Sequence, residues 1–145
     1  MCGIAGIFHL DQRPIAPTQI RRMTDLLRHR GPDDEGFALF NTHSGESLHL
    51  KGPDSPTGVA LPDISQFSIL HSPFNLALSE RRLAIQDLSA AGHTPMTTPD
   101  GAQTISFNGE IFNFLELRAE LCALGHNFQS RGDTEVLLAA YRDVS

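Results

Sequence analysis

The chain has 145 residues, of which 40% are hydrophobic and 19% are charged, and its formal net charge is −6 at pH 7. This length and composition predict one domain that buries a hydrophobic core. Its 11 lysine and arginine residues lie in short groups, so no nucleic acid partner is expected. No apolar stretch approaches the ~20 residues of a membrane span and no secretory leader is recognisable, which predicts a cytoplasmic protein without a membrane partner.

The N-terminal part predicts a strand, a helix and a second strand. Residues 4–8 form a nearly continuous apolar run, which predicts a buried strand covered on both faces. A helix is expected over residues 18–29, where apolar residues recur at helical spacing before Gly31 and Pro32 end it. The apolar face of this helix would consist of Ile20, Met23 and Leu27. Residues 35–40 predict the second strand.

The middle of the chain differs from its surroundings in composition. Residues 41–73 are rich in glycine, proline, serine, histidine and aspartate, which predicts a surface insertion that forms a small hairpin with a mobile tip. Large apolar residues at every second position then predict a strand over residues 74–78. Residues 82–85 are expected to continue in an extended conformation toward a loop.

The C-terminal part predicts a short strand and two helices. The strand is expected over residues 104–107 and would end at the turn dipeptide Asn108-Gly109. A helix capped by Gly125 follows, and Asp133 begins the last helix. The apolar faces of these helices would consist of Phe114, Leu117, Leu121 and Leu124 in the first and of Val136, Leu137, Ala140 and Tyr141 in the second.

These elements predict helices packed on sheets, and periodicity leaves open whether there is one sheet or two. The arginine pair Arg81-Arg82 is interpreted as a local site or a solvated helix face. Cys122 lies within an apolar helical pattern and is interpreted as a small core residue, so no disulfide with Cys2 is expected.

Motifs that are absent narrow the chemistry. The sequence contains no glycine-rich phosphate-binding loop, no CxxC or HExxH metal motif and no GxSxG nucleophile motif. Its seven histidines have no metal-ligand spacing, so no metal site is expected. What remains is a series of polar clusters, which are MCG (1–3), RHRGPDDEG (28–36), SERRLAIQDLS (79–89), FNGEIFN (107–113) and RGDTEV (131–136).

Cys2 directly follows the initiator methionine. Its small side chain is compatible with removal of Met1, which would place a thiol and a free α-amine on the same residue. An α-amine titrates near ~7.7 to 8.0, so part of it is neutral at pH 7 and can accept a proton from a neighbouring nucleophile. From the dipeptide alone, a chance cysteine at a frayed terminus is the alternative interpretation.

Taken together and in this order, the clusters closely resemble the glutaminase domain of class II glutamine amidotransferases, and within that class the asparagine synthetase family. The segments RHRGPD, ERRLAIQDLS, AGHTPM and FNGEIFNFLELRAEL favour that branch over the glucosamine-phosphate and purine-forming enzymes. The resemblance implies an α+β fold, the four-layer αββα sandwich of antiparallel sheets found in N-terminal nucleophile (Ntn) hydrolases, which would be incomplete in this chain.

The resemblance also assigns roles in glutamine hydrolysis. Cys2, freed of Met1, would attack the side-chain amide of L-glutamine, release ammonia and form a thioester that water hydrolyses. The Asn108 side chain and the Gly109 N–H would bind the oxyanion. Arg82 would bind the α-carboxylate of the substrate, a task for which a guanidinium has paired donors.

Further residues would complete the substrate pocket and support it. Glu110 and Asp133 resemble acceptors for the polar head group, with Asp133 binding the α-ammonium ion, and the backbone from Leu83 to Ile85 would line the pocket. Gly3 would allow close approach of substrate and backbone. His29 and Arg30 are assigned structural support near the site.

Members of this family continue into an ATP-dependent synthetase domain, which residues 1–145 do not include. The resemblance therefore implies no cofactor in this segment, ATP and magnesium in that domain, and ammonia transfer to activated aspartate. Missing strands would leave sheet edges open, so association, including a homodimer, is an expectation. Two alternatives stay open, namely a sugar or secondary-metabolite carboxylate as acceptor, suggested by the 41–73 insertion, and a catalytically silent binding module.

Overall fold

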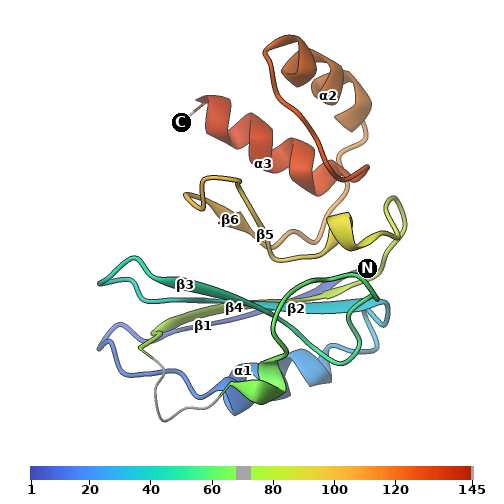
Figure 1. Ribbon diagram of the computed structural model, residues 1–145. Coiled ribbons are helices and arrows are strands. Elements are labelled where there is room, and N and C mark those ends of the chain that lie inside the picture. Colours follow the sequence, from blue (N-terminus) through green and yellow to red (C-terminus); the bar gives the residue numbers. More distant parts are fainter. Residues whose placement is uncertain (68–72, 145) are drawn as a thin grey trace.

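A computed structural model describes residues 1–67 and 73–144 of the chain. Figure 1 shows the arrangement of its helices and strands. In chain order they are β1 (Gly3–Phe8), α1 (Pro17–Leu26), β2 (Asp34–Phe40), β3 (Ser47–Lys51), β4 (Leu76–Arg82), β5 (Met96–Thr97), β6 (Thr104–Ile105), α2 (Phe114–Ala123) and α3 (Asp133–Val144). Within the described ranges, no helix combines the length and the apolarity needed to cross a bilayer.

The strands form two antiparallel sheets. The larger sheet has the order β1-β4-β2-β3, and the smaller one pairs β5 with β6. In the larger sheet Glu80 of β4 lies opposite Ile4 of β1 and Gly36 of β2. The sequence prediction of an α+β fold with helices packed on sheets is confirmed, and the described residues form two sheets.

The elements are stacked in layers (Figure 1). Helix α1 covers one face of the larger sheet, the β5-β6 hairpin lies over the opposite face, and α2 and α3 lie beyond the hairpin. Strand β4 is therefore covered on both sides. Ser79 and Arg81 face the α1 side, where the Thr24 hydroxyl of α1 donates to Ser79 Oγ at 2.6 Å. Because side chains alternate along a strand, Glu80 and Arg82 face the hairpin side.

The main core lies between α1 and the larger sheet. Its fully buried residues include Ile20 of α1, Phe37 and Leu39 of β2 and Ala77 of β4. The predicted helix face is confirmed, since Met23 and Leu27 pack against this core. The helix itself ends at Leu26, a few residues earlier than predicted.

The prediction that the first strand is buried on both faces is wrong. In β1 buried and exposed residues alternate, and Ile4 and Phe8 are 41% and 51% exposed. The reason is that Ile4 and Phe8 lie on the face of this edge strand opposite α1, where, among the described residues, the short β5-β6 hairpin packs little on β1.

The segment 41–73 is more than a surface insertion. Its strand β3 forms a hairpin with β2, which lies before the segment, so the hairpin predicted within residues 41–73 instead extends the larger sheet. In addition, Leu50 and Ile64 are buried in the main core, and Phe67 packs against it. The segment is polar in composition, yet several of its described apolar residues contribute to the core. Residues 68–72 lie outside the described part of the chain, and the predicted mobile tip stays a prediction.

Helix α2 covers most of its predicted face, since Leu121 is buried and Phe114 and Leu117 are half-buried, whereas Leu124 is exposed. The end of α2 is confirmed, since Gly125 has a φ of +100° and His126 and Gly125 donate to Leu121 and Cys122 carbonyls, the pattern of a Schellman cap. Cys122 is exposed rather than part of the core. Helix α2 packs mainly on α3 at one end of the molecule, so only one side of it is covered.

Helix α3 buries only part of the stripe predicted for it. Val136 and Leu138 are buried, whereas Tyr141 is 60% exposed. The helix packs against both α2 and the β5-β6 hairpin, so two neighbours, rather than one, decide which of its residues are covered.

Arg81 is fully buried, and its interpretation as part of a solvated face is wrong. Its guanidinium lies 3.3 Å from Glu35 and 2.8 Å from Asp54, which also bonds to Arg28 at 2.5 Å. These ion pairs attach the loop after β3 to the α1 side of the sheet. Burial raises the pKa of Glu35, while the Asp54 N–H and the Arg81 charge partly oppose that rise.

Candidate active site

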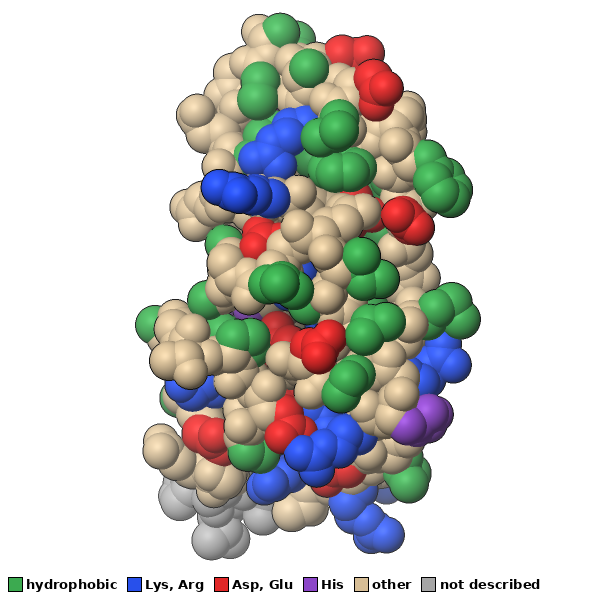
Figure 2. All heavy atoms as spheres, turned by 90° about the vertical axis from the view of Figure 1, so that its right-hand side faces the viewer, with side chains coloured by type: hydrophobic (Ala, Val, Ile, Leu, Met, Phe, Trp, Pro, Cys, Tyr) green, Lys and Arg blue, Asp and Glu red, His purple; other side chains and the backbone are tan. Residues whose placement is uncertain are grey.

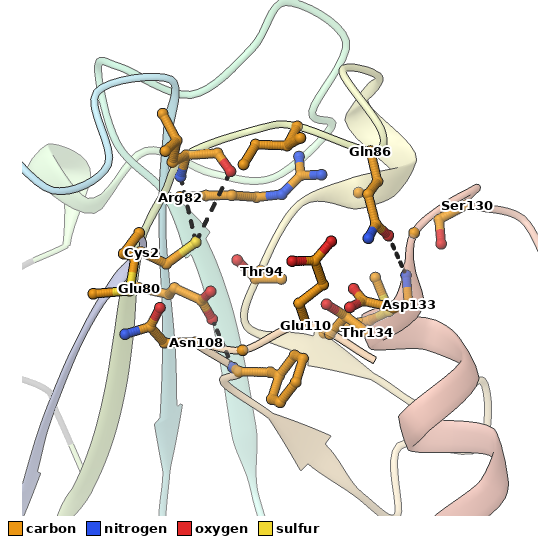
Figure 3. Close-up of a pocket in the computed structure, with 18 residues that line it drawn as sticks. Cys2, Glu80, Arg82, Gln86, Thr94, Asn108, Glu110, Ser130, Asp133 and Thr134 are labelled. Carbon is orange, nitrogen blue, oxygen red and sulfur yellow. Dashed lines mark hydrogen bonds between the residues drawn. The ribbon is translucent and has the colours of Figure 1, made fainter. Parts of the chain in front are cut away.

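One pocket of about 280 Å³ opens between the larger sheet, the β5-β6 hairpin and the start of α3 (Figure 3). Segments far apart in the sequence line it, from the N-terminus to the first turn of α3. Figure 2 shows the face that carries the N-terminus, where hydrophobic side chains lie along the middle and lysine and arginine side chains gather toward the α1 end. Met1 and Ile85, which line the pocket, are 77% and 76% exposed.

Cys2 lies directly before β1, and three contacts hold it at the pocket. The Leu83 N–H donates to Cys2 Sγ at 3.4 Å, and the thiol lies 4.0 Å from the Leu83 carbonyl oxygen. Arg30 Nε donates to the Cys2 carbonyl at 3.1 Å. The terminus is thus not frayed, because both its backbone and its side chain are bound. Dashed lines in Figure 3 mark the two contacts of the Cys2 sulfur.

Arg82 ends β4 on the pocket side, and its guanidinium donates to the Asp87 carbonyl at 2.5 Å. Gly92 packs directly on that guanidinium, since a Cβ there would lie 2.5 Å from Nη2. The neighbouring backbone is held by Asp33, whose N–H donates to the Arg82 carbonyl and whose carboxylate accepts from the Ala84 N–H. The RHRGPD cluster therefore serves to fix the end of β4.

Glycine is required at position 31 of that cluster. A Cβ on Gly31 would overlap the backbone of Arg81 and Arg82. Only a residue without a side chain lets the loop approach β4 closely enough for the Asp33 contacts to form.

The turn at Asn108-Gly109 is anchored on both sides. Before it, the Phe107 N–H donates to Glu80 Oε2 at 3.1 Å, and a Cβ on Gly109 would lie 2.5 Å from the Phe107 ring. After it, the Ile111 N–H donates to Asp133 Oδ2 at 3.0 Å. Asn108 and Gly109 themselves are exposed and line the pocket, and Figure 3 shows Asn108 beside Glu80.

Asp133 connects three segments of the site. Its carboxylate binds the Ile111 N–H, and its own N–H donates to Gln86 Oε1 at 3.1 Å. A second link runs beside it, where Asp87 Oδ2 accepts from the Arg131 N–H at 2.7 Å. The loop after β4, the 108–111 turn and the start of α3 therefore hold one another in place.

Most of the predicted site residues line this pocket. They are Cys2, Arg82, Leu83, Ile85, Asn108, Gly109, Glu110 and Asp133. The supporting residues do not. Arg30 is absent from the lining and donates a hydrogen bond to the Cys2 carbonyl, and His29 is exposed outside the pocket. Gly3 allows a close approach to Leu27 rather than to the pocket, since a Cβ added at Gly3 would lie 2.9 Å from the Leu27 Cβ.

Several lining residues were missed from the sequence. They include Glu80, Gln86, Met96, Thr94, Phe107, Ser130 and Thr134. A signal existed for Glu80, because it precedes Arg82 by two positions in a strand and must share its face. No local signal marks Thr94 or Ser130, because loop conformation alone brings them to the pocket.

Glu80 is 1% exposed, and its surroundings shift the pKa of its carboxyl group. Burial raises its pKa from 4.5 to about 7, an effect that the Phe107 N–H, the Thr94 hydroxyl and the Arg82 charge only partly counteract. The negative charge of Asp34 adds to the rise. Within the part of the chain that the structure describes, no three His, Cys, Asp or Glu residues come together in a way that could hold a metal ion.

A comparison with known protein families matches residues 62–145 to the family described as glutamine amidotransferase domain. The chain belongs to this family. The matched range contains Arg82, the Asn108-Gly109 turn and Asp133, whereas Cys2 lies before it. The predicted family is thereby confirmed.

Individual relatives of this glutamine amidotransferase domain match nearly the whole chain. It is 35% identical over 147 residues to a Bacillus subtilis (strain 168) protein named asparagine synthetase (glutamine-hydrolyzing) 1, covering 98% of this chain and 18% of that protein. A Methanocaldococcus jannaschii protein named putative asparagine synthetase (glutamine-hydrolyzing) 2 is 30% identical over 158 residues, covering 99% of this chain and 24% of that protein.

A relative with a different name also matches. The chain is 30% identical over 139 residues to an amidophosphoribosyltransferase of Methanothermobacter thermautotrophicus, covering 94% of this chain and 28% of that protein. The chain thus spans 18% to 28% of the length of these relatives.

Proposed function

We propose that the chain hydrolyses L-glutamine to glutamate and ammonia with Cys2 as the nucleophile. The observation that carries this proposal is the meeting, in one pocket of a glutamine amidotransferase domain, of a thiol, an Asn-Gly turn, a guanidinium and a buried carboxylate. Each group corresponds to one requirement of the reaction, namely attack, oxyanion binding and recognition of the two charges of an amino acid.

The chemistry begins with removal of Met1, which would leave the Cys2 α-amine free. The amine takes the thiol proton as sulfur attacks the amide carbon, and the resulting oxyanion accepts from the Asn108 side chain and the Gly109 N–H. When the carbon–nitrogen bond breaks, the amine returns its proton to the leaving ammonia. Water then cleaves the thioester and releases glutamate, which restores the thiol.

Recognition of the charged groups of glutamine is proposed to use three further side chains of the pocket. Arg82 binds the α-carboxylate, and Asp133 together with Glu110 binds the α-ammonium ion. Asp133 Oδ2 already accepts from the Ile111 N–H, which leaves Oδ1 for the substrate. The backbone between Leu83 and Ile85 lines the side of the pocket.

The ammonia is proposed to serve an ATP- and magnesium-dependent amidation of aspartate in a C-terminal synthetase partner. The asparagine-forming part of this proposal is supported by the names of the Bacillus and Methanocaldococcus relatives, of which the chain spans 18% and 24%. The layer order of helix, sheet, sheet and helices supports the further proposal that the domain has the four-layer Ntn-hydrolase fold.

The test is glutamine turnover by the full-length protein, measured as glutamate and ammonia released. Cys2→Ala should abolish it, because no other group replaces the sulfur. Cys122→Ala is the matched control, since this second cysteine is exposed and lies outside the pocket. Mass spectrometry after treatment with diazo-oxo-norleucine should find Met1 absent and one adduct on Cys2. Turnover that survives in Cys2→Ala would disprove the proposal.

A further inference from the structure

Glu80 lies in the pocket without a role in the proposed reaction. It is the buried carboxyl of β4 on the hairpin side of the sheet, whereas Glu35 is a buried carboxyl on the α1 side. Figure 3 shows its carboxyl group below Cys2 and beside Asn108, pointing toward the backbone of Phe107. A buried carboxyl is costly to ionise, so its presence in the site requires an explanation.

The contacts of Glu80 connect it to the Asn108-Gly109 turn. Its Oε2 accepts from the Phe107 N–H at 3.1 Å, one residue before Asn108. The Phe107 ring in turn lies against Gly109, because a Cβ there would be 2.5 Å from the ring. Phe107 is therefore attached to β4 through its backbone and supports the turn through its ring. Movement of Phe107 would move both proposed oxyanion donors.

Glu80 is itself well placed to act as an anchor. It lies in the middle of the larger sheet, paired with both β1 and β2, whereas the turn is exposed and belongs to no strand. The hydrogen bond thus joins a rigid element to a loop. Donors that stabilise an oxyanion must be held in place before the reaction, which is what such a bond provides.

We propose that Glu80 is a positioning residue that fixes the Asn108-Gly109 turn for oxyanion binding through its hydrogen bond to the Phe107 N–H. The role in catalysis rests on the proposed glutaminase function, whereas the anchoring of the turn does not.

The strength of the hydrogen bond between the Phe107 N–H and Glu80 depends on whether the Glu80 carboxyl is protonated. An ionised carboxylate is a stronger acceptor for an N–H than a neutral acid. The charged groups around Glu80 are Arg82 on its own strand and Asp34 on β2, and the imidazole of His93 lies 3.0 Å from Asp34. With the Glu80 pKa raised to about 7, the carboxylate form predominates only above neutral pH. The turn is therefore held more firmly at pH 8 than at pH 6.

The first test needs no enzyme activity. The amide proton of Phe107 is followed by ¹H–¹⁵N NMR between pH 5.5 and 8.5. It should shift with a midpoint near pH 7 in the wild-type protein, and the Gly109 amide should follow it. Both titrations should vanish in Glu80→Gln. In Glu35→Gln, which removes a buried carboxyl from the opposite face of the sheet, both should persist.

The second test separates positioning from substrate binding. In Glu80→Ala, which lacks the acceptor, kcat for glutamine should fall about tenfold, part of the ~100-fold loss that removal of an oxyanion donor causes. KM should change little, because Arg82 and Asp133 are untouched. Glu80→Gln keeps an acceptor oxygen and should restore kcat at pH 8 to within about threefold of wild type.

The outcomes are distinguishable. If the wild-type protein hydrolyses no glutamine, the proposed function fails, and the amide titration still decides whether Glu80 anchors the turn. If the Phe107 and Gly109 amides titrate identically in wild type and Glu80→Gln, the anchor does not exist. If they differ but Glu80→Ala keeps the wild-type kcat, the positioning role in catalysis is overturned.

Discussion

Replacing Glu80 by glutamine should stabilise the protein above neutral pH. Burial raises the pKa of this carboxyl from 4.5 to about 7 in the folded state, and the Phe107 N–H, the Thr94 hydroxyl and Arg82 offset only part of the rise. Between these two values the folded protein keeps a proton that the unfolded chain has released. Folding stability contributed by the neutral carboxyl is therefore lost as the pH rises through this window.

The magnitude follows from the two pKa values. Each pH unit between them lowers the unfolding free energy by about 1.4 kcal/mol, which amounts to about 3 kcal/mol by pH 8. Glutamine cannot ionise, and its carbonyl oxygen can still accept from the Phe107 N–H. The variant and the wild-type protein should thus be similar in stability near pH 4.5, and the variant should be more stable by up to about 3 kcal/mol at pH 8.

The assay is urea unfolding of both proteins at several pH values from 4.5 to 8, followed by circular dichroism. The same substitution at Glu120, which is exposed on α2, is the control and should show no pH-dependent difference from wild type. A difference between Glu80→Gln and wild type that stays constant over this pH range would refute the reasoning, because it would mean that the folded state does not raise the pKa.

Three further changes test other parts of the structure. Gly31→Ala places a Cβ against the Arg81 backbone, so it should displace the loop that fixes Arg82 and raise KM for glutamine with a stability loss of about 1–3 kcal/mol. Burial, aided by the His93 charge, lowers the pKa of His49, so stability should fall as the pH drops below 6.5, and His49→Gln should remove that loss in urea unfolding. Ile20→Ala, at a fully buried position, should cost about 2–5 kcal/mol by the same assay, and a loss below 1 kcal/mol would contradict the assigned core.

Local patterns in the sequence predicted a helix or strand correctly where the element packs with a single face against a single neighbour. The helix face of Ile20, Met23 and Leu27 packs on one sheet, and Gly125 caps α2 as its position suggested. The order of the polar clusters was also sufficient to recognise the family. These features depend on residues close in sequence, whose spacing directly sets which side chains share a face.

Packing against several neighbours was not predictable in this way. Cys122 is exposed because α2 lies at the end of the molecule, and Leu138 rather than Tyr141 is buried because α3 has two neighbours. Leu50 and Ile64 enter the core from a segment of polar composition. An apolar pattern shows which face can be buried, but it does not show what covers that face or from how many sides.

The sequence by itself therefore predicted most of the helices and strands, the family and the residue types available for chemistry. Only the tertiary structure decided that Cys2, Arg82, Asn108 and Asp133 meet in one pocket, and that Glu80 lies beneath it with a pKa near neutrality. The reason is physical. Hydrogen-bond partners, desolvation and the distance between charges arise from contacts across β4, the Asn108-Gly109 turn and α3, which are remote in the chain and adjacent only after folding.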